Sequence, residues 1–332
     1  STSLNATQNL FSGMQDKAKV DQAKAGVGVS QSNLNNVKAK LSYDLKSAYM
    51  NLIFSQNSIK LTQDIIGRRE SNLKLVELRF TSGRENKGSV LLSKAYLEQA
   101  KYDHLQAINS LELGQVQLAK VLGIEDNTEQ IEVSDPIPTT KPTDKIDLKQ
   151  LALDIPDYQL ALAQEQSADA GIVLARASFF PSLNLTGSTG RTDDQWSPQN
   201  KNWSIGVGVT IPLFNGGKDY FATQAAYSNY RTAVFSKQNA FRQAIMKLKQ
   251  TYNSYLEAVQ KLEVDRAFTD AALTRAKVAR ETYNNGLLSF DDWDTIENDL
   301  INRQKALIQS ERDRVIAEAT WEQAQGKGVI NE

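Results

Sequence analysis

Hydrophobic residues recur every seven positions between residues 45 and 80 of the chain. The set consists of Leu45, Leu52, Ile59, Ile66, Leu73 and Phe80. A sustained heptad pattern without proline is typical of a coiled-coil seam. It predicts one helix over 14–81, which Gly83 ends, and a returning helix over 88–122, which Gly123 ends. Taken alone, this pattern is equally consistent with a long, solvent-exposed coiled coil.

The hydrophobic period changes to two in a later part of the chain, which predicts strands over 179–190 and 203–213. In the second strand the apolar positions share one face: Trp203, Ile205, Val207, Val209 and Ile211. Each alternating run has about the nine to eleven residues of a tilted membrane strand. The polar stretch between the runs predicts an exposed loop. No further strands are predicted that could cover the apolar face, so we expect lipid to cover it.

The chain repeats itself with an offset of 203 residues. Leu10-Phe11-Ser12-Gly13 returns as Leu213-Phe214-Asn215-Gly216, and Gly83 returns as Gly286. The first repeat spans 1–123, with a strand over 1–11 before its two helices. The proline-rich stretch 124–146 is an extended connector. The second repeat, 147–327, consists of helix 147–178, strands 179–190 and 203–213, and helices 216–284 and 289–325, and 328–332 form a tail.

The two repeats differ at their beginnings. The first has no counterpart of helix 147–178 or of strand 179–190, and we expect that an N-terminal truncation accounts for both. Within helix 147–178, Pro156 suggests that a short helical turn precedes the main helix. An open set of three or four strands cannot span a bilayer, because its edges leave backbone groups unpaired in lipid. Three copies with four strands each would close a 12-stranded barrel.

The changes between helix and strand carry their own signals. Pro181 and Pro212 lie where one hydrogen-bond pattern stops and another starts, as expected of a residue without an N–H group. Gly13 and Gly216 permit the turn from strand to helix.

Composition argues against an enzyme. The 332 residues carry a formal charge of −1, no cysteine and one histidine, His104. A basic surface for nucleic acid is absent, and thiol or Ser/His catalysis and a soft-metal site lack their residues. The glycine-rich stretches match no phosphate-binding loop. We therefore expect no catalytic site, cofactor or metal. No apolar run is long enough for a membrane helix, and His104 is expected to be a solvated helix residue.

Five short motifs in this order resemble the TolC-like outer-membrane efflux protein family. They are A-R-A-S-F-F-P-S-L-N-L (175–185), I-P-L-F-N-G-G (211–217), N-L-F-S-G (9–13), R-F-T-S-G (79–83) and T-Y-N-N-G (282–286). The resemblance covers nearly the whole chain. It implies a mainly α-helical fold with a small β part, in which long antiparallel coiled-coil helices continue from membrane β-strands.

In such a protein, three copies form an α-helical tunnel through the periplasm and a β-barrel in the outer membrane of a Gram-negative bacterium. The resemblance implies the exit duct of a tripartite efflux pump or type I secretion system. The implied partners are a periplasmic adaptor (membrane fusion) protein, an inner-membrane pump and outer-membrane lipid, with no nucleic acid. The alternative is a soluble coiled-coil scaffold or periplasmic adaptor-like binding protein. Adaptors, however, combine helical hairpins with domains of many short strands, which are not predicted here.

The resemblance also suggests an acidic ring at the tunnel entrance. Asp292 lies six residues after Gly286, at the family's acidic position, with Asp294 as a second candidate, whereas Thr295 stands where some members carry a second aspartate. The alternative for Asp292 is a capping box with Ser289. Adaptor contact is the hypothesis for the two tip turns, and ordinary turn chemistry is the alternative. The turn residues concerned are Gly83, Glu85, Asn285 and Gly286.

Two tryptophans lie in or beside the predicted strands. Trp203 is a candidate for an aromatic belt at the membrane interface, with packing at the base of the loop as the alternative. Trp196 is expected to be an ordinary loop residue.

Overall fold

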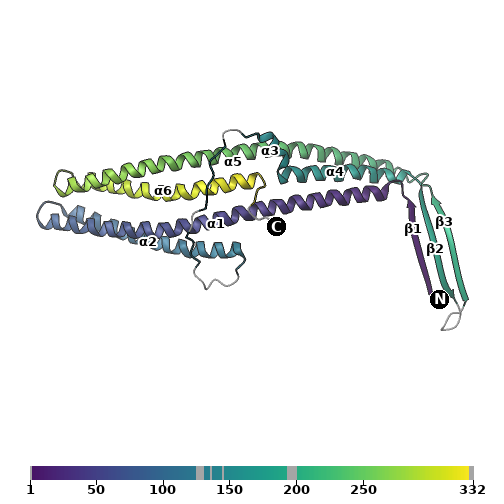
Figure 1. Cartoon of the computed structure of the whole chain (residues 1–332), viewed down its shortest axis with the longest axis horizontal. Coiled ribbons are helices and arrows are strands. Elements are labelled where there is room, and N and C mark those ends of the chain that lie inside the picture. The colour runs from purple at the N-terminus through teal and green to yellow at the C-terminus, as the bar shows by residue number, and fades with distance from the viewer. Residues whose placement is uncertain (1, 125–130, 135–136, 144–145, 193–199, 329–332) are drawn as a thin grey trace. The chain divides into compact units, whose positions relative to one another are not determined.

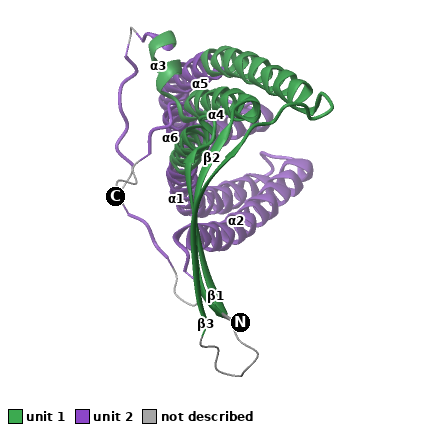
Figure 2. Cartoon of the chain, turned by 90° about the vertical axis from the view of Figure 1, so that its right-hand side faces the viewer, with its two compact units in different colours: residues 1–36, 149–246 green, residues 37–148, 247–332 purple. Residues whose placement is uncertain are grey.

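The computed structural model describes residues 2–124, 131–134, 137–143, 146–192 and 200–328. Its elements are β1 (Thr2–Phe11), α1 (Gln15–Thr81), α2 (Lys87–Leu122), α3 (Leu148–Asp154), α4 (Pro156–Arg176), the 3-10 turn η1 (Ala177–Phe179), β2 (Ser182–Thr192), β3 (Asn200–Thr210), α5 (Lys218–Asn284) and α6 (Phe290–Ala324) (Figure 1). Two compact units comprise residues 1–36 with 149–246, and 37–148 with 247–332 (Figure 2). Because α1 and α5 each begin in the first unit and end in the second, the units cut across the sequence repeats. Trp196 and parts of the connector and tail lie outside the described residues.

The 203-residue offset extends to the ends of the helices. Both α1 and α5 have 67 residues, and their first and last residues are 203 positions apart. Gly13, Gly83 and Gly123 have φ angles of 62°, 74° and 73°, and their counterparts Gly216, Gly286 and Gly326 have 63°, 75° and 70°. A left-handed glycine thus ends each of the four long helices.

The second unit contains two helical hairpins, α1 with α2 and α5 with α6, which lie side by side (Figure 1). The predicted heptad seam is only partly its core: Leu52 is fully buried, but Phe80 is 41% exposed. Near the turn, the buried positions of α1 are Arg69, Asn72 and Val76 instead. The buried stripe is displaced because α1 contacts α6 as well as α2.

The predicted helix 147–178 is divided in the first unit. Ile155 is extended, with φ −71° and ψ 144°, and Pro156 starts α4. Proline has no N–H to continue the ladder of α3, so the short preceding helix suggested by Pro156 is present. The end of the predicted range is the turn η1.

Both strand ranges need correction. β2 begins at Ser182 and not at 179, because η1 precedes it and Phe180, the residue before Pro181, is held extended. β3 spans Asn200–Thr210 and not 203–213. It ends before Pro212, which cannot donate to the ladder. The shifted beginning adds polar residues that sequence periodicity assigned to the loop.

The strands form one antiparallel sheet in the order β1-β2-β3. Directly opposed residues share a face, and the register therefore sorts the side chains. One face is mostly apolar and carries Leu4, Ala6, Leu183, Leu185, Trp203, Ile205, Val207 and Val209, together with the polar residues Gln8, Thr189, Arg191 and Lys201. The other face is polar or small and carries Ser3, Asn5, Thr7, Asn184, Thr186, Ser188, Asn202, Ser204, Gly206, Gly208 and Thr210. The apolar face of β3 is exposed in the described part of the chain.

The junction between β1 and α1 needs a glycine. A Cβ on Gly13 would lie 2.6 Å from the Cβ of Phe180 and 2.8 Å from the carbonyl oxygen of Ala177. Ser12 Oγ then donates to Asp16 Oδ2 over 2.8 Å, which holds the first turn of α1. The next residue, Met14, has a φ of 72° and is the counterpart of Gly217.

Gly13→Ala should therefore destabilise the protein more than Gly83→Ala does. Both substitutions place a side chain at a left-handed φ, which costs about 1–2 kcal/mol, but a Cβ on Gly83 meets nothing within 4 Å. Thermal unfolding of the two purified variants compares the costs. Equal losses of stability would show that the contact with Phe180 does not constrain the junction.

Candidate functional site: the tip of the two hairpins

An aromatic cluster joins the two hairpins where their turns meet. Its buried members are Val76, Ala279, Tyr283, Phe290 and Trp293. The rings of Tyr283 and Trp293 are stacked, with centroids 4.3 Å apart and planes at 11°, and Phe290 meets both edge-on. Val76 comes from α1 and the other members from α5 and α6, so this tip core ties the first hairpin to the second.

Polar contacts connect the tip core to the turn between α1 and α2. Arg79 Nη1 donates to the carbonyl oxygen of Tyr283 over 2.5 Å, and its guanidinium lies 4.4 Å from the centre of the Tyr283 ring. The Tyr283 hydroxyl donates to Glu85 Oε2 over 3.0 Å. Burial and the neighbouring Glu85 carboxylate raise the pKa of Tyr283, so the phenol stays protonated and can donate. Glu85, predicted for adaptor contact, is thus engaged within the chain.

An ion pair joins α1 to α6 nearby. Arg69 Nη1 lies 3.2 Å from Asp294 Oδ1, and their side chains are only 7% and 12% exposed. Asn298 Nδ2 donates to Asp294 Oδ2 over 2.9 Å, and Arg69 also lies over the ring of Tyr96 at 4.6 Å. Asp294 is therefore neutralised inside the hairpin pair, which leaves Asp292 as the candidate for an exposed acidic ring.

Asp292 is exposed and also takes part in a helix cap. Its backbone N–H donates to Ser289 Oγ over 3.2 Å, and Ser289 Oγ donates to Asp292 Oδ2 over 2.6 Å. The capping alternative is thus realised in the chain, while the carboxylate remains on the surface beside Asp291. Its role in an acidic ring stays a prediction.

The two tip turns have the same backbone geometry. Arg84 N–H donates to the carbonyl oxygen of Arg79 over 2.8 Å, and Leu287 N–H donates to that of Thr282 over 3.0 Å. Gly83 and Gly286 supply the left-handed residue that this motif requires. With Asn285, both glycines are exposed, so they remain candidates for contact with a partner.

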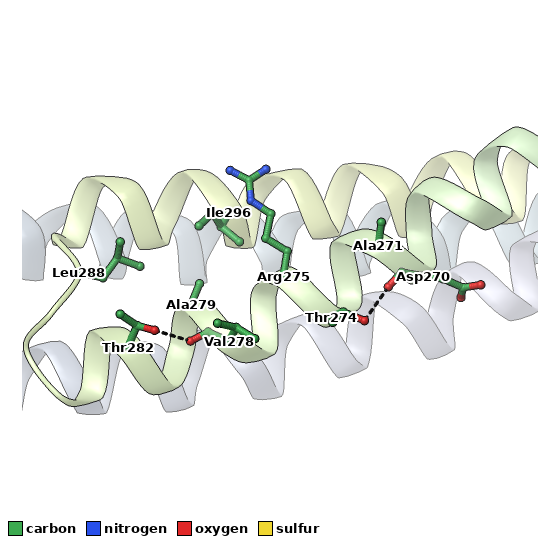
Figure 3. A pocket seen from close by; sticks show the side chains of 9 residues that line it. All are labelled: Asp270, Ala271, Thr274, Arg275, Val278, Ala279, Thr282, Leu288 and Ile296. Atoms are coloured by element: carbon green, nitrogen blue, oxygen red, sulfur yellow. Dashed lines mark hydrogen bonds between the residues drawn. The ribbon is translucent and has the colours of Figure 1, made fainter.

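A groove runs along α5 beside the tip core and has a volume of about 730 Å³ (Figure 3). We call it the α5 groove. Its lining consists of Asp270, Ala271, Thr274, Arg275, Val278, Ala279, Thr282, Leu288 and Ile296. Small and apolar side chains predominate, and Thr274 and Thr282 satisfy their hydroxyls on the backbone of α5.

Two other predicted residues are placed clearly. Trp203 is opposite Thr189 in the sheet and is 78% exposed, so it is not packed at the base of a loop within the chain. His104 is not simply solvated: it is half-buried, and its Nδ1 lies 2.9 Å from Thr62 Oγ1 on α1. The expectation for His104 was wrong because periodicity does not show which polar positions of α2 face α1.

The described residues contain no group of three or more His, Asp or Glu side chains placed to bind a metal ion. Within the same ranges, every helix is either too short or too polar to cross a membrane.

The sequence profile described as "Outer membrane efflux protein" matches residues 1–124 and 148–327. The chain belongs to this family. The family consists of outer-membrane efflux channels of Gram-negative bacteria and not of enzymes, and it includes TolC-like proteins. The predicted family and the outer-membrane localisation are thus confirmed, whereas the N-terminal truncation stays a prediction.

Individual relatives are distant and longer than this chain. The solvent efflux pump outer membrane protein SrpC of Pseudomonas putida is 25% identical over 320 residues, which cover 88% of this chain and 63% of SrpC. The cation efflux system protein CusC of Escherichia coli is 23% identical, over 99% of this chain and 73% of its own length. The chain thus spans less than two thirds of SrpC.

Solved structures share the fold of this family member. The outer membrane protein VceC of Vibrio cholerae has a TM-score of 0.86 at 21% identity, over 98% of this chain and 79% of VceC. The predicted fold class, long helices with a small antiparallel sheet, is confirmed.

Sequence analysis missed the contacts that hold the tip together. Arg69 and Asp294 are 225 positions apart, and Tyr283 and Glu85 are 198 positions apart. No local spacing marks such pairs. The sequence does show that the two repeats differ at these positions. With the offset of 203 residues, Arg69 corresponds to Ala272, and Tyr283 corresponds to Phe80.

Proposed function

We propose that this family member is the exit duct of a tripartite efflux pump or type I secretion system. Three copies form a channel that contacts a periplasmic adaptor and, through it, an inner-membrane pump. The observation that carries the proposal is the two-faced sheet, with one face mostly apolar and exposed and the other polar. Along the chain, the strands lead into hairpins that each contain one 67-residue helix. Contact with lipid suits the apolar face, and contact with water suits the polar face.

The limits of the apolar face support a membrane position. Beyond Trp203, the same face carries the opposed pair Lys201 and Arg191. An aromatic residue followed by charges is the arrangement expected where hydrocarbon gives way to head groups. We therefore retain Trp203 as an interface residue. Strands from three copies would close into one barrel, which leaves no free edge in lipid.

The names of the relatives support export without defining its cargo. SrpC is named for solvents, CusC for cations and AprF of Pseudomonas aeruginosa for secretion of an alkaline protease. In the alternative, a scaffold or adaptor-like protein, the exposed apolar face of β3 would remain in contact with water, which is unfavourable.

Mass measurement and planar-bilayer conductance of the full-length protein test the proposal together. A trimer in detergent that conducts ions after insertion is expected. A protein that stays monomeric, or that dissolves without detergent and forms no pores, would contradict the duct and favour the scaffold.

Asp292→Asn should reduce cation preference of the pore at low salt. Three exposed carboxylates gathered at the entrance would attract cations, and screening should shrink the difference at high salt, where the Debye length falls below about 8–10 Å. The measurement is reversal potential under a salt gradient. Capping by Ser289 alone predicts a less stable tip with unchanged selectivity, and that result in open channels would remove the acidic ring. Asp313→Asn, which changes a half-exposed carboxylate of α6 that pairs with Arg312, is the control.

A further inference from the structure

A pocket of about 390 Å³ lies in the second unit, beside residues 137–139 of the connector. We call it the connector pocket. Its other lining residues come from α1, α5 and α6, and all of them belong to the same unit. The volume lies near the lower end of the range of small-molecule sites, which is about 300–1,000 Å³. The pocket is thus large enough for a compact ligand.

The lining of the connector pocket combines apolar walls with arginines. Eight of the fourteen lining residues are apolar, and one of these is Phe54. Arg266, Arg312 and Arg314 line the same pocket, whereas its one carboxylate is that of Glu311. The guanidinium of Arg312 lies over the Phe54 ring, 4.5 Å from its centre. Apolar walls with a few convergent cations suit a ligand that has an apolar body and an anionic group.

The charge of Arg314 is the least compensated of the three. Arg266 lies 3.8 Å from a carboxylate oxygen of Glu311, and Arg312 lies 2.7 Å from one of Asp313. Within the described residues, Arg314 has hydrogen bonds to the connector but no carboxylate at ion-pair distance. In the same part of the chain, its Nε atom is buried and has no hydrogen-bond partner. A guanidinium with a spare buried donor favours an anion.

Arg314 also attaches the connector to the helices. Its Nη1 donates to Thr139 Oγ1 over 2.5 Å, and its Nη2 donates to the carbonyl oxygen of Thr140 over 3.2 Å. Glu318, one turn further along α6, accepts from the N–H and the hydroxyl of Thr140 over 2.9 and 2.6 Å. The Tyr255 hydroxyl donates to the carbonyl oxygen of Thr140 over 2.6 Å. These contacts hold the connector wall of the pocket in place.

We propose that the connector pocket binds a small organic anion. Its apolar body lies against Phe54 and Leu262, and its carboxylate or sulfonate group accepts hydrogen bonds from Arg314. Transfer of the apolar body out of water and the charge-assisted hydrogen bonds both favour binding. The bound anion contacts three helices and the connector at once, so it stabilises their association. All of these groups belong to one copy, and the site therefore does not depend on the proposed channel.

Calorimetric titration of the full-length protein in detergent with naphthalene-2-sulfonate tests the site. A titration into detergent alone is the blank. Saturable binding of one anion per chain is expected. Naphthalene-2-methanol has a similar apolar body without the charge, so it should bind at least about tenfold more weakly. Equal affinity for the two compounds, or uptake that does not exceed the blank, would overturn the proposal.

Three variants separate charge from the position of the connector. Arg314→Gln should weaken binding of the sulfonate at least about tenfold, and Glu311→Gln should strengthen it about two- to fivefold because it removes a repelling charge. Thr140→Val is the control: it removes the hydroxyl that binds Glu318 without a change of charge, and it should leave the affinity unchanged. Thermal unfolding confirms that each variant is folded.

Two results with folded variants would contradict the site. One is an affinity that responds to neither Arg314→Gln nor Glu311→Gln. The other is a loss of binding in Thr140→Val as large as that in Arg314→Gln, since attachment of the connector would then explain both. Either result would leave the mass and conductance expected of the proposed channel unaffected.

Discussion

Ile205→Arg is expected to prevent stable folding of the protein in a bilayer, whereas Ser204→Arg is tolerated. The two residues are neighbours near the middle of β3 and lie on opposite faces of the sheet. An arginine on the lipid face near the bilayer midplane costs about 2–4 kcal/mol, and the same side chain on the aqueous face remains hydrated. In an oligomer the cost applies to every copy.

The measurement is the free energy of unfolding from lipid vesicles, with the amount of each variant in the outer-membrane fraction as a second readout. Ser204→Arg is matched in charge, size and depth, so it corrects for effects of arginine itself. If the two variants lose stability equally, the faces of β3 do not differ in their solvent.

The second large effect is expected at the tip. Arg69→Ala should cost about 3–5 kcal/mol of unfolding free energy, because it leaves the Asp294 carboxylate buried without its partner. Asn298 and its own helix cannot neutralise the remaining charge. Arg69→Ala/Asp294→Ala should recover much of the loss, since the uncompensated charge is then absent.

Arg266→Ala is the control for removal of an arginine. Arg266 Nη1 lies 3.5 Å from Glu263 Oε1, but the two side chains are 51% and 63% exposed, so the pair should contribute less than about 1 kcal/mol. Chemical denaturation of the three variants measures the differences. A double variant as unstable as Arg69→Ala would mean that lost packing, for example on Tyr96, outweighs the buried charge.

The helices and the sheet could be predicted because local patterns specify them. The offset of 203 residues marked both long helices, and Gly83 and Gly286 marked their ends, since a left-handed residue there favours glycine. The alternation of Ile205 and Val207 with small polar residues marked the two-faced strand. Strand ends were less certain, because backbone pairing also extends through polar residues such as Asn200 and Asn202.

The sequence predicts where the tip lies but not which of its side chains contact one another. Asp292 and Asp294 look alike in a sequence, yet one lies on the surface as part of a helix cap and the other is buried against Arg69. That difference depends on the position of α6 against α1, which heptad spacing does not determine. The same reason explains why Phe80, a heptad residue, is exposed within one chain.

The central claim is that one face of the sheet meets lipid and the other meets water. Single cysteines at Ser204, Thr210, Val207 and Val209 test it most directly, in the otherwise cysteine-free protein folded in membranes. A membrane-impermeant, water-soluble maleimide should label the positions of Ser204 and Thr210 and leave those of Val207 and Val209 unlabelled until the membrane is dissolved. Equal labelling of both faces in the intact membrane would contradict the claim.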